Sequence, residues 1–333
     1  MSVVWTIAEH VNGELKAVSF ELLARGRKLA DKLGGQLASV VIGDAVSEPR
    51  MRELIERGAD VVYSAQDTRL AHFVCESYAR VLSSLIRTCQ PDIILAAATS
   101  SGRTLMPYVA IQVRAGLTAD CTELDIEEGT GNLLQTRPAI GGNIMATIKT
   151  PDHRPQMATV RPKSSRPLPR DPDRKGTIIV IPVDDGMIDT RVSVLGYRKD
   201  AVDFVNLEEA DVVIAGGKGM KKAEHFTLLR ALAETFGGVV GASREAVDRG
   251  WIGYPHQIGL SGKTISPKLY IGAGISGSIQ HLAGIKTSEV IVSINPDPDA
   301  NLHKIADFAI VGDAFHVLPE LQRQLEARKK GVE

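Results

Sequence analysis

Glycine, serine, asparagine and aspartate recur in the C-terminal third of the sequence, each time directly after a short apolar run. Glycine lets a backbone approach a phosphate closely, and the N–H groups at the start of a helix attract an anion. Tight turns favour the same residues, so each segment taken alone could equally be an ordinary turn. Five such ends together favour a ligand that carries phosphate groups. The segments are Gly216-Gly217-Lys218-Gly219, Ser243-Arg244, Gly272-Ala273-Gly274-Ile275-Ser276-Gly277, Asn295 and Gly312-Asp313.

Three further polar residues, Arg244, Gln280 and His281, are expected at the same edge, although a simple turn does not require them. A single histidine is more often a structural residue than a functional one. His281 differs because it lies one turn into a helix predicted from Ser276, where its imidazole could reach a bound cofactor ring. These residues favour a binding site over a set of turns.

Hydrophobic periodicity places the segments in a C-terminal domain, residues 201–333, in which strands and helices alternate. Such an alternation predicts a parallel sheet with right-handed crossovers, which binds ligands at the carboxyl ends of its strands. The predicted strands are 211–215, 238–242, 268–271, 289–294 and 308–311. The predicted helices are 201–207, 222–236, 244–249, 276–283, 301–306 and 319–329.

The N-terminal domain, residues 1–200, starts with the same alternation and also predicts a parallel sheet. A small-residue turn at 98–103 could receive an anion at the start of the next helix, or could simply cap that helix. The predicted strands here are 3–8, 36–42, 61–63 and 92–97, and the helices are 17–33, 50–57, 70–88 and the helix that ends at Val113.

From Cys121 onward the apolar pattern changes to a period of two, which predicts an antiparallel section inserted into the first domain. Residues 161–175 are polar and rich in proline, and we expect them to be an exposed connection before a strand at 177–183. Arg137, Arg161 and the turn Gly141-Gly142-Asn143 could contribute to a partner interface, or be hairpin turns and surface arginines. The antiparallel strands are predicted at 120–126, 133–137, 144–148 and 157–160.

Composition excludes several classes of function. The 39 basic and 40 acidic residues give a net charge of −1, so no long-range field attracts nucleic acid. No apolar run approaches the roughly 20 residues that cross a bilayer, and no export signal is visible, so we expect a cytoplasmic protein without membrane insertion. Cys75, Cys89 and Cys121 are far apart and form no CxxC pair, which predicts neither disulfides nor a metal site.

At this point the sequence resembles the α subunits of electron transfer flavoproteins, the ETF/FixB family. The resemblance covers essentially the whole chain, and the stretch 274–284 is its most specific part. Upstream motifs are similar to a subset common in anaerobic bacteria. The segments that carry the resemblance are 241–251, 257–263, 267–271, 274–284, 294–295 and 310–313, with 136–139, 141–143, 154–157 and 160–162 upstream.

The resemblance implies two doubly wound α/β domains: a nucleotide-hydrolase-like first domain that contacts a partner and a Rossmann-like second domain that binds FAD. It also implies a heterodimer with a β subunit that passes single electrons between a dehydrogenase, such as an acyl-CoA dehydrogenase, and another redox protein. Whether the heterodimer bifurcates electrons stays open. In that case the β subunit would hold a second flavin that exchanges electrons with NADH, and ferredoxin or flavodoxin would be a further partner.

Two other classes of function stay open as well. One is a stand-alone nicotinamide- or flavin-dependent dehydrogenase, although no GxGxxG follows the first strand and no acid–base pair is evident. The other is a non-catalytic nucleotide-binding adaptor.

By the resemblance, the stretch 276–281 contacts the pyrophosphate and flavin, and Asn295 and Asp313 contact the ribityl–adenosine portion. Arg244, Ser261 and His281 tune the redox potential of the ring. Ser261 stands where threonine is usual and Lys218 where arginine is common, which puts the potential in doubt more than FAD binding. The full set implied to bind the cofactor is Lys218, Ser243, Arg244, Gln257, Ile258, Gly259, Leu260, Ser261, Gly274, Ser276, Gly277, Ser278, Ile279, Gln280, His281, Asn295, Asp313 and Ala314.

Overall fold

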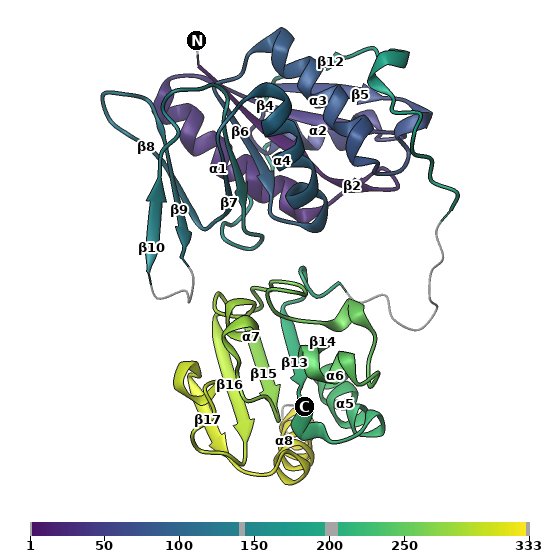
Figure 1. Cartoon of the computed structure of the whole chain (residues 1–333), viewed down its shortest axis with the longest axis vertical. Coiled ribbons are helices and arrows are strands. Elements are labelled where there is room, and N and C mark those ends of the chain that lie inside the picture. The colour runs from purple at the N-terminus through teal and green to yellow at the C-terminus, as the bar shows by residue number, and fades with distance from the viewer. Residues whose placement is uncertain (1, 140–143, 197–205, 331–333) are drawn as a thin grey trace. The chain divides into compact units, whose positions relative to one another are not determined.

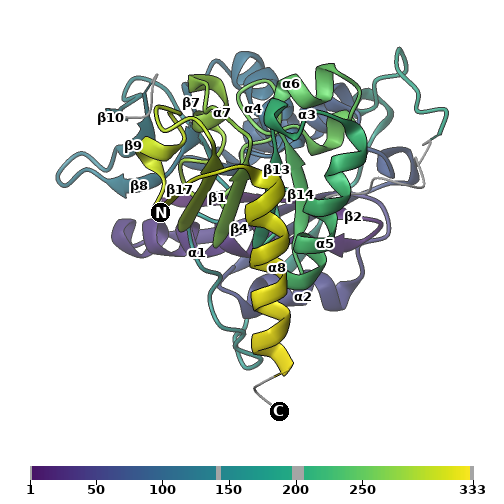
Figure 2. The ribbon, with the colours of Figure 1, turned by 90° about the horizontal axis from the view of Figure 1, so that it is seen from below.

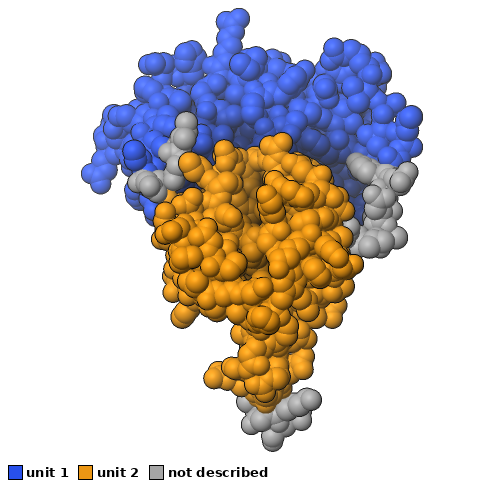
Figure 3. Space-filling model, turned by 60° about the horizontal axis from the view of Figure 1, so that its bottom comes forward, with its two compact units in different colours: residues 1–196 blue, residues 197–333 orange. Residues whose placement is uncertain are grey.

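The computed structural model describes residues 2–139, 144–196 and 206–330. The chain divides into two compact units, Met1–Gly196 and Tyr197–Glu333 (Figures 1 and 3). The turn Gly141-Gly142-Asn143 and most of the helix predicted over 201–207 lie outside the described residues. Each unit contains a parallel sheet flanked by helices, so the predicted α/β class is confirmed.

The first unit is built on a seven-stranded sheet of order β12-β5-β4-β1-β6-β11-β7, and all neighbouring strands are parallel. A short hairpin, β2 and β3, follows β1. The strands are β1 (Val3–Ala8), β2 (His10–Val11), β3 (Glu14–Leu15), β4 (Gln36–Gly43), β5 (Val61–Gln66), β6 (Ile93–Ala97), β7 (Leu117–Cys121), β11 (Gln156–Val160) and β12 (Thr177–Val180). The helices are α1 (Ala17–Leu33), α2 (Glu48–Glu56), α3 (Cys75–Cys89) and α4 (Ser100–Val113), with 3₁₀ turns η1 (Thr68–Leu70) and η2 (Asp185–Met187).

Alternating residues of the central strands point into two separate cores. Val4 of β1 packs in the core formed with α1 and α2, whereas its neighbour Trp5 packs in the core formed with α3 and α4. Both side chains are fully buried. Because helices cover both faces, the central strands are buried along nearly their whole length and are mostly apolar, as is usual for parallel sheets.

The predicted antiparallel section is present but smaller than expected. It consists of β8 (Glu123–Ile126), β9 (Leu133–Pro138) and β10 (Met145–Ile148), in the order β10-β9-β8. The strand predicted at 157–160 does not belong to it. That segment is β11, which lies between β6 and β7 in the parallel sheet and is buried throughout. A short apolar strand does not reveal from its own residues which neighbours it will pair with.

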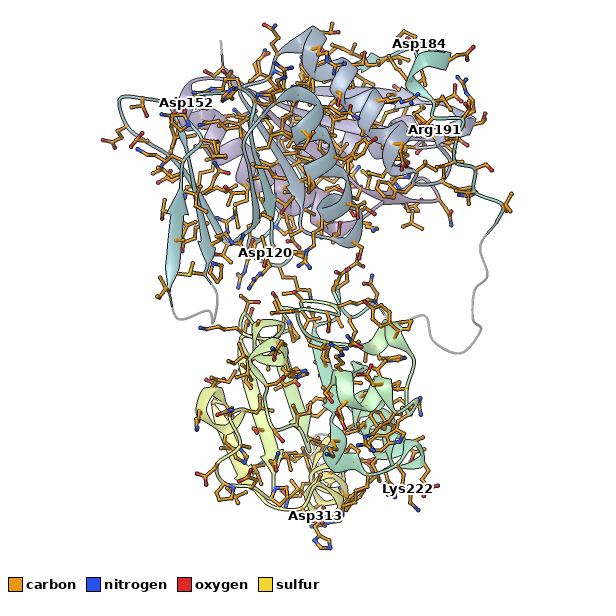
Figure 4. The ribbon with its side chains drawn as sticks, in the orientation of Figure 1. Asp120, Asp152, Asp184, Arg191, Lys222 and Asp313 are labelled. Atoms are coloured by element: carbon orange, nitrogen blue, oxygen red, sulfur yellow. The ribbon has the colours of Figure 1, made fainter. Side chains whose placement is uncertain are left out.

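The strand predicted at 120–126 is in fact two strands. It divides at Thr122, so that β7 pairs with β11 in the large sheet and β8 pairs with β9 in the small one. Asp120 lies just before this division with a φ of 61° (Figure 4). One segment of the chain therefore connects the two sheets.

The polar tract 161–175 is anchored and only partly exposed, contrary to the prediction of an exposed connection. Arg161 is 6% exposed, and its Nε donates to Oδ1 of Asp120 at 3.0 Å while Nη2 donates to Oδ2. Further along, Nη2 of Arg174 donates to Asp60 at 2.7 Å. These ion pairs join residues far apart in the sequence, which is why local composition did not reveal them.

The second unit is built on a five-stranded parallel sheet of order β14-β13-β15-β16-β17. The strands are β13 (Val212–Gly216), β14 (Val239–Ala242), β15 (Leu269–Ala273), β16 (Val290–Asn295) and β17 (Phe308–Val311). The helices are α5 (Phe226–Phe236), α6 (Arg244–Asp248), α7 (Ile279–Ala283) and α8 (Ala314–Lys330), with 3₁₀ turns η3 (Lys218–Met220), η4 (Ala223–His225), η5 (Tyr254–His256) and η6 (His303–Ile305).

The two faces of this sheet are covered differently. Helices α5 and α8 lie side by side over one face (Figure 2) and share its core with Ile214 and Ile271. The other face is covered by α7, by the long segment between α6 and β15 and by the segment between β16 and β17. They contribute Leu282, Ile258 and Leu302 to the core that contains Tyr270. The strand order reverses between β13 and β15, and a crevice opens at such a reversal in open α/β sheets.

Three predicted helices of this unit begin or extend differently. Helix α7 begins at Ile279 and not at Ser276, because Gly277 has a φ of 83° and Ser278 is the N-cap residue. Helix α8 begins at Ala314, before the predicted start at Pro319, because Asp313 caps it by accepting from the N–H of Phe315 at 2.9 Å. The helix predicted at 301–306 is only the 3₁₀ turn η6. No helix of the described residues has the length and apolarity needed to cross a bilayer.

The pair of buried Arg161 with part-buried Asp120 gives a test of this fold. Arg161→Ala removes both hydrogen bonds to Asp120, which is then left with Arg103 at 3.9 Å, so we expect the free energy of unfolding to fall by about 2 kcal/mol. The control is Arg166→Ala, in the same tract but exposed, which should change stability by less than about 0.5 kcal/mol. Urea unfolding followed by circular dichroism measures both, and equal effects would contradict the anchored tract.

Candidate functional site

A pocket of about 510 Å³ lies in the second unit at the point where the strand order reverses. Its walls come from the segments that follow β13, β14 and β15, from the loop 258–261 and from the start of α7. The lining residues are Lys218, Ser243, Arg244, Glu245, Asp248, Ile258, Gly259, Leu260, Ser261, Gly274, Ile275, Ser276, Gly277, Ser278, Gln280 and His281. Most of the residues predicted to bind a cofactor are therefore brought together.

The segment between β15 and α7 forms one wall. Ser276 and Ser278 are exposed, so their hydroxyls are available to a ligand. Gly277 between them has a φ of 83°, and a Cβ there would lie 2.5 Å from the backbone nitrogen of Leu302. Only glycine fits this position, and it allows the two serines to flank the turn.

His281 forms the inner end of the pocket and is 4% exposed. Its Nε2 lies 2.8 Å from the hydroxyl of Tyr270, and its Nδ1 lies 3.2 Å from the carbonyl oxygen of Ile258. Burial lowers the pKa of His281 to about 4, so the imidazole is neutral near pH 7.

Two carboxylates that the sequence analysis did not anticipate line the pocket beside its cations. Nε of Arg244 donates to Asp248 at 3.2 Å, and Nζ of Lys218 lies 4.0 Å from Glu245. Both Arg244 and Asp248 are largely exposed. The spacing of four residues between them on a predicted helix was the available signal. The positive charge of Arg244 is therefore partly compensated.

The loop 258–261 is held in place by residues outside the pocket. The side-chain amide of Gln257, which is buried, donates to the carbonyl oxygen of Ser261 at 3.0 Å and to its Oγ at 3.1 Å. The hydroxyl of Tyr254 donates to the same carbonyl at 3.0 Å. Gln257 thus supports the loop and does not line the pocket, while the hydroxyl hydrogen of Ser261 can still be donated.

Four other predicted residues do not line the pocket. Ile279 is 63% exposed at the start of α7. Asn295 is buried and its side-chain amide donates to the carbonyl oxygen of Ile275 at 3.0 Å, so it fixes the wall from behind. Asp313 caps α8 (Figure 4), and Ala314, the first residue of that helix, is buried in the core. Contact of these four residues with a cofactor stays a prediction, and Asn295 and Asp313 have the structural roles just described.

The small-residue turn at 98–103 in the first unit behaves as a cap. Thr99 accepts from the N–H of Gly102 at 3.2 Å and donates to Oε1 of Glu9 at 2.5 Å. A carboxylate of the protein is thus bound to the N-cap residue of α4, and its negative charge disfavours a second anion nearby. Among the described residues, no group of three histidine, cysteine, aspartate or glutamate side chains could hold a metal ion.

Known families and relatives match both units. Residues 4–186 match the electron transfer flavoprotein domain, and residues 206–286 match the electron transfer flavoprotein FAD-binding domain. The chain is 49% identical to the electron transfer flavoprotein subunit alpha of Thermoanaerobacterium thermosaccharolyticum, over 98% of each chain. It is 45% identical to the protein FixB of Clostridium saccharobutylicum, over 96% of this chain and 95% of the relative. It is 43% identical to the subunit alpha of Megasphaera elsdenii, over 99% and 97%. The chain therefore belongs to the electron transfer flavoprotein α-subunit family, which includes the FixB proteins.

Proposed function

We propose that this chain binds FAD in the pocket of its second unit and pairs with a β subunit. The heterodimer then carries single electrons between a dehydrogenase, such as an acyl-CoA dehydrogenase, and another redox protein. The observation that supports this most directly is the convergence of Ser243, Arg244, Ser261, Ser276 and His281 on one pocket. The match of the second unit to the FAD-binding domain of this family supports it independently.

The donors of the pocket fit the parts of FAD. The exposed hydroxyls of Ser276 and Ser278, on either side of Gly277, suit a pyrophosphate. Ser261, exposed on the pocket loop, and His281, buried at the inner end, suit the acceptor atoms of a flavin ring. Bound FAD would supply the redox chemistry, and the protein sets its position and its potential.

Arg244 would favour electron uptake by a ring beside it because its charge stabilises negative charge there. Asp248 opposes this effect, since its carboxylate lies 3.2 Å from Nε of Arg244. Both side chains are largely exposed, so solvent screens each contribution. The balance between the two side chains would therefore set a modest positive field at the ring.

Counting the flavins tests the proposal. The chain purified with its co-expressed β subunit should contain at least one FAD per heterodimer, measured after release into solution. A count of two would extend the proposal to a bifurcating carrier with a second flavin on the β subunit. A complex without flavin would contradict it and favour a nucleotide-binding adaptor, and substrate oxidation by the chain alone would favour a dehydrogenase.

Gly277 offers a structural test of the location. We expect Gly277→Ala to lower the affinity for FAD at least about tenfold, because its Cβ would lie 2.5 Å from backbone and force the wall to move. The control is Gly237→Ala, which also has a positive φ, 63°, but meets nothing within 4 Å. Fluorescence titration with FAD compares the two, and equal affinities would place the cofactor elsewhere.

Arg244 and Asp248 should move the flavin potential in opposite directions. Arg244→Ala should lower the potential and Asp248→Asn should raise it, each by roughly 50 mV. A shift of this size is a little less than a tenfold change in a one-electron equilibrium, which corresponds to about 59 mV. Arg230→Ala, an exposed arginine on α5, makes the same change of charge outside the pocket and should leave the potential unchanged. Shifts of equal size in all three would indicate a general charge effect.

The buried neutral state of His281 predicts a pH dependence of stability in the flavin-free chain. The pKa is about 4 in the folded protein against 6.5 for an ordinary histidine, so only the unfolded chain takes up a proton between these values. Above about pH 6.5 His281 is neutral in both states, so it does not change the free energy of unfolding. Below that pH the free energy of unfolding should fall, by about 3 kcal/mol in total at pH 4.

The measurement is urea unfolding as a function of pH. His281→Gln should lack this part of the profile, whereas His316→Gln, an exposed histidine on α8, should keep it. Identical profiles for all three proteins would show that His281 does not titrate in this window.

A further inference from the structure

Tyr270, the second residue of β15, is a buried phenol that contacts His281 of the pocket. It is 0% exposed, and its ring lies over Gly272, where a Cβ would come within 3.2 Å of the Tyr270 oxygen. Glycine at this position leaves the phenol room to lie along the sheet. Its hydroxyl reaches Nε2 of His281 at 2.8 Å, which connects the sheet to the inner end of the pocket.

The partners of His281 fix where its hydrogen lies. The carbonyl oxygen of Ile258 can only accept a hydrogen bond, so Nδ1, 3.2 Å away, must carry the hydrogen. A neutral imidazole has one hydrogen, so Nε2 is the acceptor and the hydroxyl of Tyr270 is the donor. The opposite arrangement would place two lone pairs against each other at Ile258.

We infer that Tyr270 is a positioning residue: by donating to Nε2, it holds His281 as a hydrogen-bond donor through Nδ1, facing the loop that lines the pocket. An acceptor atom of a bound ring could then share this hydrogen with the carbonyl of Ile258. The inference rests on the proposed function, because the acceptor belongs to the flavin. It also makes a claim about the flavin-free chain, which can be tested separately.

A packing role for Tyr270 is the alternative, since the residue belongs to the same core cluster as Leu302 and Ile258. Tyr270→Phe separates the two roles because it retains the ring and removes only the hydroxyl. The matched control is Tyr254→Phe. Tyr254 also donates a hydrogen bond to the pocket loop, to Ser261 at 3.0 Å, but it does not touch His281.

The first test uses the full chain without flavin, labelled with ¹⁵N in histidine, with His281→Gln to assign the signals. Nitrogen NMR should show His281 as the Nδ1–H tautomer with a hydrogen-bonded Nε2. Tyr270→Phe should shift the Nε2 signal towards that of an unbonded nitrogen, and Tyr254→Phe should not. An Nε2–H tautomer, or an Nε2 signal unchanged in Tyr270→Phe, would overturn the inference. If Tyr270→Phe does not fold, the wild-type tautomer decides.

The second test uses the flavin-loaded protein. Tyr270→Phe should weaken FAD binding about fivefold to tenfold and shift the flavin potential, as expected for one lost hydrogen bond that orients a donor. Tyr254→Phe should change the affinity less than about twofold. If Tyr270→Phe alters the Nε2 signal but leaves the FAD affinity and the flavin potential unchanged, Tyr270 does not position His281 for the cofactor, and the inference is overturned. If the wild-type protein binds no flavin, the proposed function fails, while the tautomer still tests the position of His281.

Discussion

The reversal of strand order between β13 and β15 is the constraint on which the second unit depends. Right-handed crossovers send the chain to opposite faces on either side of this point, so the segments that leave β13 and β15 diverge. The pocket is the space between them, and its walls are necessarily loop segments and helix starts. Asn295 and Gln257 do not touch the space, yet their buried amides hold those walls in place.

Sequence patterns predicted the regular elements well where the apolar pattern had clear ends. The bounds of α1 and β17 agree with the predicted residues, because one apolar face or one uninterrupted apolar run defines each. They failed where pairing depends on distant residues, as for β11. They also did not indicate that Asp313, at a strand end, caps α8. The tautomer of His281 depends on Tyr270 and Ile258, whose approach only the folded chain shows.

The pocket combines weakly balanced charges at its mouth with firmly fixed neutral groups inside. Arg244 and Asp248 are largely exposed, and their separation can change with little cost in packing. His281 and Tyr270 are buried and bonded to each other, so neither can move without leaving a polar atom unpaired. The inner groups are thus suited to fixing orientation, and the outer groups to adjusting the electrostatic potential at a bound ring.

The hydrogen bond between Thr99 and Glu9 makes the helix start in the first unit differ in charge from the pocket in the second unit. Its sheet also reverses strand order, between β1 and β6, next to the start of α4. There the carboxylate of Glu9 already sits beside the helix start and pairs with Lys16 at 3.2 Å. An incoming phosphate would meet a like charge and would have to displace an internal ligand. Two sheet edges of the same topological origin therefore differ in charge: a carboxylate lies at the one in the first unit, and exposed serine hydroxyls line the one in the second.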